Sequence, residues 1–155
     1  DIFENYKNGD NVFTCHGAHR AFSKEYYSKL KFKENTCEDS YSYLFCKTNG
    51  FTYKYVKSAR IDLKLPTNLD DHKKQSQRFF TSIQILYKHF NSQFVKNAFN
   101  FPKIIFVKHL TKWLIKRPVL TVSYLFLTAW MIMESKFKNG RTDARAPSVT
   151  TKTLN

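Results

Sequence analysis

The stretch NTCEDSYSYLFCKTNGF, residues 35–51, predicts one short helix in the middle of the chain. Its apolar and small side chains recur at the spacing of one helix face, at Cys37, Tyr41, Leu44, Phe45 and Thr48. Thr36 is the expected N-cap, and Asp39 follows three positions later, close to the pattern of a capping box. Asn49 and Gly50 supply the expected C-terminal stop.

Two adjacent carboxylates, Glu38 and Asp39, fall in the first turn of this helix. Free backbone N–H groups and the helix dipole stabilise acidic side chains at such a position, so capping alone explains the pair. If Tyr41 and Leu44 face the core, Asp39 lies on the far side of the helix, over a cleft or solvent. There it is available as a general base when a substrate hydroxyl lies within reach. Both interpretations stay open at this point.

The chain as a whole is strongly basic and rich in apolar side chains. Its 155 residues suit one domain or part of a larger one, and a hydrophobic content of 42% predicts a packed core. The formal net charge of +14 favours anionic partners, such as phosphates, nucleic acid or an anionic membrane surface. Cys15, Cys37 and Cys46 form no disulfide framework, which indicates reduced thiols and a cytosolic environment.

Patterns on either side of residues 35–51 predict a mixture of strands and helices. Residues 1–11 read as a polar loop without an initiator Met, so we expect the chain to begin inside a longer natural protein. Residues 12–17 predict a short strand, and residues 51–66 one or two strands rich in β-forming side chains. Residues 23–30 predict a helix capped by Ser23. Thr67 and Asp70 repeat the capping pattern before a helix expected over residues 69–94.

Gln75, Arg78 and Phe79 share one face of that last helix, because they stand at positions i, i+3 and i+4. The donor fork of Arg binds diphosphates or sugar hydroxyls, and Gln offers both a donor and an acceptor. The alternative for such a cluster is a solvated basic surface.

The segment CHGAHRAF, residues 15–22, combines potential metal ligands with a glycine. The spacing of Cys15, His16 and His19 matches no strong zinc pattern, so metal binding here is disfavoured. Gly17 is better interpreted as a position where the backbone comes close to a ligand.

Two helices are predicted near the C-terminus, over residues 101–118 and 119–133. In the first, Lys108, Lys112 and Lys116 form a basic stripe, opposite an apolar side made by Phe106, Leu110, Trp113 and Leu114. The second is an uncharged run that spans roughly 22 Å as a helix, short of a hydrocarbon core of roughly 30 Å. A helix that lies in the membrane interface, or against a partner, is therefore expected. Residues 139–155 predict a mobile tail.

The order of these motifs resembles the C-terminal, acceptor-side half of a family-2 nucleotide-sugar glycosyltransferase with the glycosyltransferase-A fold. GAHRAFSKEYY precedes CEDSYSYLFCKTNGF, and LPTNLDDHKKQSQRF follows, so the likeness covers roughly residues 12–80. The last motif is similar to the family's QxxRW, with Phe79 in place of Trp. The resemblance implies an α/β fold, the C-terminal portion of a Rossmann-like glycosyltransferase-A domain followed by membrane-proximal helices.

The same resemblance assigns roles to residues. Asp39 would be the catalytic base that deprotonates an acceptor hydroxyl, with inversion at the sugar, and Glu38 would assist it. Gly17 and Arg20 would line the acceptor pocket. The cluster on the later helix (Gln75, Arg78, Phe79) would bind the diphosphate or the acceptor.

The implied reaction is transfer from a nucleotide-sugar donor to a glycan or lipid-linked acceptor of a cell-envelope polysaccharide. The family holds a divalent metal, Mg or Mn, through an Asp-x-Asp in its donor half. No Asp-x-Asp occurs here, so the chain is expected to be a fragment without its donor half and inactive alone. The implied parts are residues 1–94, half of the catalytic domain, residues 95–138, the membrane-proximal helices, and the tail. The implied location is the cytoplasmic face of the inner or plasma membrane.

Two other functions compete with glycosyl transfer. A non-catalytic membrane-surface or protein-interaction module would use the Lys108 stripe and the apolar run, with Glu38 and Asp39 only as a cap. A nucleic-acid binder fits the charge of +14, but the aromatic residues fall at helix-core spacing, and no binding motif occurs. Nucleic acid is therefore not an expected partner.

Overall fold

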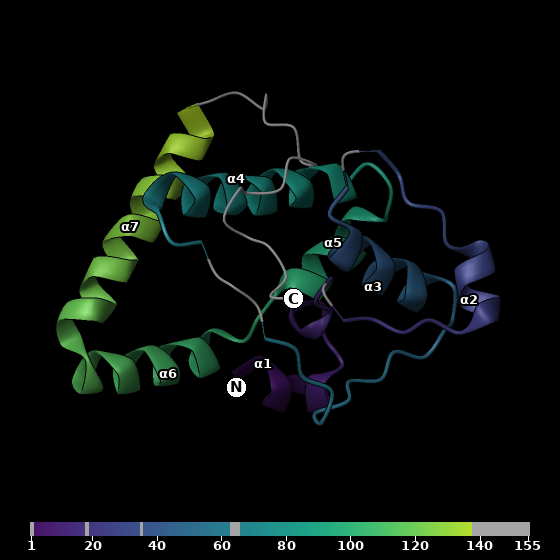
Figure 1. Cartoon of the computed structure of the whole chain (residues 1–155), viewed down its shortest axis with the longest axis horizontal. Helices are drawn as coiled ribbons and strands as arrows, with labels where there is room; N and C mark the ends of the chain where they lie inside the picture. Colours follow the sequence, from purple (N-terminus) through teal and green to yellow (C-terminus); the bar gives the residue numbers. More distant parts are fainter. Residues whose placement is uncertain (1, 18, 35, 63–65, 138–155) are drawn as a thin grey trace.

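The computed structural model of the protein describes residues 2–17, 19–34, 36–62 and 66–137, and the regular elements within these ranges are all helices. The helices, with η for 3-10 helices, are α1 (Ile2–Asn5), η1 (Tyr6–Gly9), η2 (Val12–Thr14), α2 (Lys24–Lys29), α3 (Glu38–Thr48), α4 (Leu69–Leu86), α5 (Ser92–Phe99), α6 (Lys103–Lys116) and α7 (Pro118–Phe137) (Figure 1). No strand occurs within the described ranges, so the predicted α/β fold, a portion of a Rossmann-like glycosyltransferase-A domain, is wrong.

The first predicted strand, at residues 12–17, is replaced by η2. The side chain of Asn11 accepts a hydrogen bond from the backbone N–H of Phe13 at 3.1 Å. An Asn side chain that bonds the backbone two residues later stabilises a turn in competition with extended structure. The preceding residues also differ from the predicted polar loop, since they form α1 and η1.

The β-forming residues 51–62 follow an irregular path without a partner strand in the described ranges. Their side chains bond to the N-terminal helices instead. The hydroxyl of Tyr53 lies 3.2 Å from Thr14 Oγ1, and the hydroxyl of Tyr55 donates to Glu4 Oε1 at 2.8 Å. A strand is stable only when a neighbour pairs its backbone, so β-forming composition alone does not produce a sheet here.

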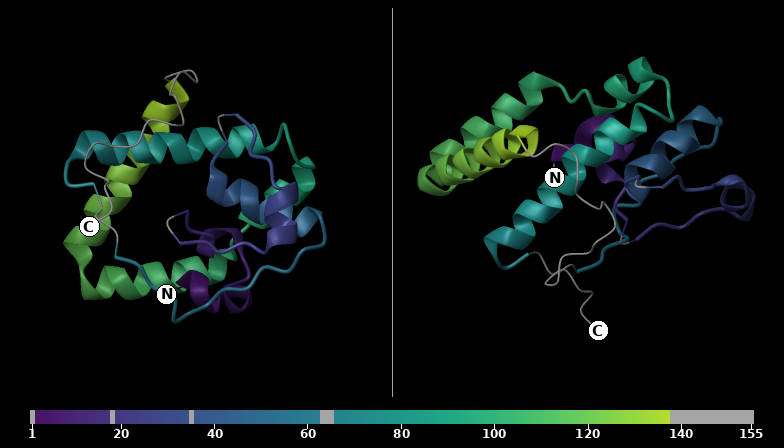
Figure 2. Two further views of the ribbon diagram at one scale, coloured as in Figure 1. Left: turned by 45° about the vertical axis from the view of Figure 1, so that its right-hand side comes forward. Right: turned by 90° about the horizontal axis from the view of Figure 1, so that it is seen from above.

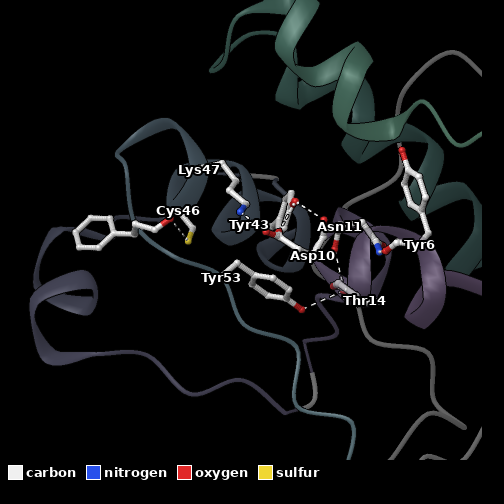
Figure 3. Close-up of polar contacts among 10 residues, drawn as sticks. Tyr6, Asp10, Asn11, Thr14, Tyr43, Cys46, Lys47 and Tyr53 are labelled. Carbon is white, nitrogen blue, oxygen red and sulfur yellow. Dashed lines mark hydrogen bonds and ion pairs between the residues drawn. The ribbon is translucent and has the colours of Figure 1, made fainter.

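A polar network joins the N-terminal helices to α3 (Figure 3). Asp10 Oδ1 accepts a hydrogen bond from the Tyr43 hydroxyl at 3.0 Å, and Lys47 Nζ lies 2.5 Å from Asp10 Oδ2. Asn11 Nδ2 donates to the carbonyl oxygen of Phe3 at 2.8 Å. These contacts position the N-terminal segment along α3.

The helix α3 supplies the centre of the core. Of its predicted apolar face, Tyr41 and Leu44 are buried, Cys37 and Phe45 are partly buried, and Thr48 is exposed. Its buried residues are Ser40, Tyr41, Ser42, Tyr43, Leu44 and Cys46. Gly50, at φ +73°, adopts the left-handed conformation that ends helices and confirms the predicted stop. The predicted N-cap is wrong, because the helix begins after Cys37 and the Thr36 hydroxyl donates to the Lys33 carbonyl at 2.7 Å.

The short helix α2 packs against α3 through one tyrosine. The Ser23 hydroxyl accepts the backbone N–H of Tyr26 at 3.2 Å, which confirms the predicted cap. The buried hydroxyl of Tyr26 donates to the carbonyl of Ser42 at 2.6 Å.

The helix predicted over residues 69–94 divides into α4 and α5. Asn68, and not Thr67, is the N-cap of α4, because its side chain accepts the backbone N–H of Asp71 at 2.8 Å. Asn91 begins a new helix by accepting the N–H groups of Gln93 and Phe94. The boundary predicted between residues 94 and 95 falls inside α5, and the predicted tail, residues 139–155, lies outside the described residues.

The two C-terminal helices are present as predicted. They meet at an elbow on the side of the molecule away from α2 and α3 (Figure 2). Pro118 forms this elbow, because it lacks the N–H that would continue α6 and has the backbone angle favoured at the first position of α7. The helix α7 also packs against α4. At this contact Lys73 Nζ of α4 lies 2.5 Å from Glu134 Oε2 of α7. No helix in the described ranges is both long and apolar enough to cross a bilayer.

Candidate functional site

The carboxylates of Glu38 and Asp39 lie beside the guanidinium of Arg20. Arg20 Nη2 is 3.9 Å from Glu38 Oε2 and 3.9 Å from Asp39 Oδ1. Its Nη1 makes shorter hydrogen bonds, to the Glu38 carbonyl at 2.9 Å and to the Ser42 hydroxyl at 2.8 Å. The structure therefore brings three of the sequence-predicted site residues together at the start of α3.

The environment of this cluster favours a structural role for Arg20. Its side chain is 14% exposed, whereas the side chains of Glu38 and Asp39 are 64% and 40% exposed. Ion pairs at such exposure contribute little to stability, so the hydrogen bonds to α3 are the stronger restraint. Arg20 thus fastens the segment before α2 to the first turn of α3.

Gly17 approaches a residue of the protein itself. A Cβ atom at this position would lie 3.0 Å from Asp39 Cγ and closer still to Asp39 Oδ1. A side chain at this position would require the partly exposed Asp39 carboxylate to move. The predicted approach of the backbone to a ligand stays a prediction, and the neighbour that the structure places at Gly17 is the predicted base, Asp39.

The predicted residues on α4 do not join this cluster. Gln75 is exposed, and Phe79 is 42% exposed. The side chain of Arg78 lies outside the described residues. Arg20 lines a pocket whose described walls contain no residue of α4. The predicted residues of α4 therefore do not meet Arg20 in this pocket.

That pocket has a volume of about 360 Å³ and lies between residues 14–23, α3 and residues 51–59. Its described walls include Cys15, Tyr26, Tyr43, Cys46 and Tyr53. Burial raises the pKa of the Cys15 and Cys46 thiols, and burial likewise raises the pKa of all three phenols. The thiols therefore stay protonated near neutral pH, which makes them weak nucleophiles.

The zinc interpretation gains no support from this region. The rings of His16 and His19 stack with their centroids 6.2 Å apart. Among the described residues, no group of three or more His, Cys, Asp or Glu side chains could hold a metal ion.

A second candidate site is formed by the exposed residues of the two C-terminal helices, which we call the α6–α7 surface. None of the residues of α6 is buried. The large hydrophobic residues exposed on α6 are Ile104, Phe106, Val107, Trp113, Leu114 and Ile115. Those exposed on α7 are Val119, Leu120, Val122, Tyr124, Leu125, Phe126, Trp130 and Met133.

Basic residues share this surface with the hydrophobic ones. Lys108, Lys112, Lys116 and Arg117 are all exposed. Lys116 Nζ lies 5.9 Å from the centre of the Trp113 ring, close enough for a cation–π contact. The sequence predicted separate basic and apolar sides for α6, but exposed hydrophobic residues occur around most of its circumference.

Sequence reasoning missed a groove inside the elbow. It has a volume of about 790 Å³ and lies between α1 and the junction of α6 with α7. Phe3 belongs to one wall, and Phe106 and Trp113 belong to the other. Apolar residues at helical spacing, Ile2, Phe3 and Tyr6, were the available signal that residues 1–11 are not a loop.

Comparisons of the chain with protein-family models, with curated proteins and with solved structures found no match.

Proposed function

We propose that the protein binds the surface of anionic membranes through the α6–α7 surface. The observation that carries the proposal is the exposure of large hydrophobic residues along both helices, with no residue of α6 buried. Single exposed hydrophobic residues are common, but a contiguous group on adjoining helices marks a surface that contacts a partner or a membrane.

The charges beside these hydrophobic residues favour an anionic bilayer as the partner. Between residues 87 and 137 the only acidic residue is Glu134, which is paired with Lys73. The basic residues in the same range are Lys88, Lys96, Lys103, Lys108, Lys112, Lys116, Arg117 and Lys136. Each such cation near an anionic leaflet contributes about 1 kcal/mol, and the cytoplasmic leaflet is the more anionic one.

The aromatic residues support an interfacial position. Trp113, Tyr124 and Trp130 are 50%, 60% and 45% exposed. Trp and Tyr side chains are enriched at the level of the lipid headgroups, where the ring contacts acyl chains and the polar edge contacts water. Lysines beside them extend their charged ends toward phosphates while their methylene chains cover apolar surface.

Glycosyl transfer by Asp39 stays a prediction that no observation tests. The described residues are helical and lack the α/β framework that the family resemblance implied. The described pocket wall also lacks the predicted α4 residues. The membrane-surface function depends on neither feature, and we therefore prefer it.

The test compares two variants of equal charge in a vesicle sedimentation assay. Lys108, Lys112 and Lys116 are changed together to Gln in one variant, and the exposed Lys24, Lys31 and Lys33 are changed to Gln in the other. Loss of three cations from the α6–α7 surface should weaken binding to phosphatidylglycerol vesicles by about two decades.

The control variant should lose much less affinity, because its lysines lie near α2, away from the α6–α7 surface. Phosphatidylcholine vesicles should distinguish the variants little. Equal losses of affinity in both variants would show that binding depends on net charge alone. Unchanged binding of the α6 variant would contradict the proposed role of the α6–α7 surface.

A further inference from the structure

The groove between α1 and the elbow of α6 and α7, which we call the elbow groove, has both apolar and basic residues in its lining. Its large apolar lining residues include Phe3, Phe106, Leu110, Trp113, Leu120 and Leu125. Its basic lining residues include Lys112, Lys116 and Arg117. No acidic side chain occurs among its described lining residues.

The basic part of the lining is a consequence of how the elbow is built. Lys116 is the last residue of α6, and Arg117 is its C-cap, with a backbone N–H that donates to the Trp113 carbonyl at 2.8 Å. Pro118 then turns the chain into α7. Two consecutive cations therefore stand where the two helices meet, and both line the groove.

We propose that the elbow groove holds one acyl chain of an anionic phospholipid, with the lipid phosphate at Lys112, Lys116 and Arg117. The groove is continuous with the α6–α7 surface, since Trp113, Leu120 and Leu125 belong to both. The apolar lining residues suit a hydrocarbon chain, and the three cations of the same lining suit a phosphate. The inference rests on the proposed membrane function, because the same surface must reach the bilayer for a lipid to enter.

Single-chain lipids below their critical micelle concentration test the groove without a bilayer. Trp130→Phe leaves Trp113, in the groove wall, as the remaining tryptophan of the chain. Dodecyl phosphate should shift the Trp113 emission to shorter wavelength with saturation at one molecule per chain. Dodecyl phosphocholine should bind more weakly because its headgroup is zwitterionic. Inorganic phosphate should cause no shift. Each methylene added between octyl and dodecyl phosphate should tighten binding about fourfold.

A matched pair of variants locates the bound chain. Thr121 lines the groove, whereas the exposed Ser123 does not. Thr121→Phe should reduce dodecyl phosphate affinity at least tenfold by occupying the groove. Ser123→Phe adds the same ring elsewhere on α7 and should leave the affinity unchanged. Circular dichroism checks that both variants keep the helical fold.

The outcomes separate this inference from the membrane function. If Thr121→Phe loses dodecyl phosphate but still sediments with phosphatidylglycerol vesicles, both proposals stand. If the unmodified chain sediments with vesicles but does not bind dodecyl phosphate saturably, or if Thr121→Phe binds it normally, the groove assignment fails and the membrane function remains. Failure of both assays overturns both. Concentration-dependent dimerisation that Thr121→Phe abolishes would assign the groove to a second copy of the chain and overturn the lipid.

Discussion

At the scale of single residues, Arg20 connects several groups of the predicted site. It donates to a backbone carbonyl and to a hydroxyl of α3, and its guanidinium stands within 4.0 Å of two carboxylates. Removal of the side chain would leave the Ser42 hydroxyl and the start of α3 without this donor. A hydrogen bond to a charged group contributes about 1.5–3 kcal/mol. The bond to the Glu38 carbonyl is exposed and contributes less than the partly buried bond to Ser42.

We therefore predict that Arg20→Ala lowers the free energy of unfolding by about 2 kcal/mol, measured by urea titration with circular dichroism. The matched control is Arg60→Ala, because Arg60 is exposed and its removal should change stability by less than about 0.5 kcal/mol. Equal effects of the two substitutions would contradict the structural role assigned to Arg20.

A second residue-scale prediction concerns pH. Burial raises the pKa of Cys15 in the folded chain, whereas an unfolded thiol titrates near 8.5. The unfolded state therefore loses its proton first as pH rises. The stabilising contribution is fully present below about pH 8.5, and it decreases above that value by up to about 1.4 kcal/mol per pH unit.

Cys15→Ala should flatten the fall in unfolding free energy between pH 8 and pH 10, measured by urea titration under reducing conditions. Cys46 also has a raised pKa, so part of the slope should persist in this variant. Cys37→Ala is the control for removal of a thiol that is only partly buried. A slope unaffected by Cys15→Ala would show that this thiol is accessible in the folded protein.

At the scale of elements, local signals predicted the helices better than the strands. The Ser23 cap, the helix that ends at Gly50 and the two C-terminal helices follow from spacing, caps and Pro118. Residues 51–62 have strand composition, but a strand depends on a distant partner that periodicity does not reveal. Asn91 was an available signal for the break between α4 and α5.

The candidate sites, like the helices and strands, were predictable only where the residues involved lie near one another in the sequence. Sequence order placed Gly17, Arg20 and Asp39 in one site, and the structure brings them together because loop and helix are near in sequence. The elbow groove needed a contact between α1 and α6, which lie far apart in the chain. No pattern within a short window predicts such a contact, because it depends on the packing of the whole chain.

At the scale of the whole molecule, the buried hydrophobic residues and most of the exposed hydrophobic residues belong to different helices. The buried core lies around α3, whereas α6 and α7 carry exposed hydrophobic residues and cations. The net charge of +14 attracts any anionic surface over roughly 10 Å at 0.1 M salt. Apolar residues on α6 and α7 then determine which side of the molecule enters the headgroup region.

The position of the two tryptophans in a bilayer tests this account most directly. We propose to measure quenching of Trp113 and Trp130 by phospholipids brominated at different depths, in phosphatidylglycerol and phosphatidylcholine vesicles, with Trp113→Phe and Trp130→Phe to separate the signals. The account predicts a shift of emission to shorter wavelength in the anionic vesicles, with the strongest quenching by bromines near the headgroup end of the chains. Emission unaffected by anionic vesicles, or quenching strongest at the bilayer centre, would contradict an α6–α7 surface that lies in the membrane interface.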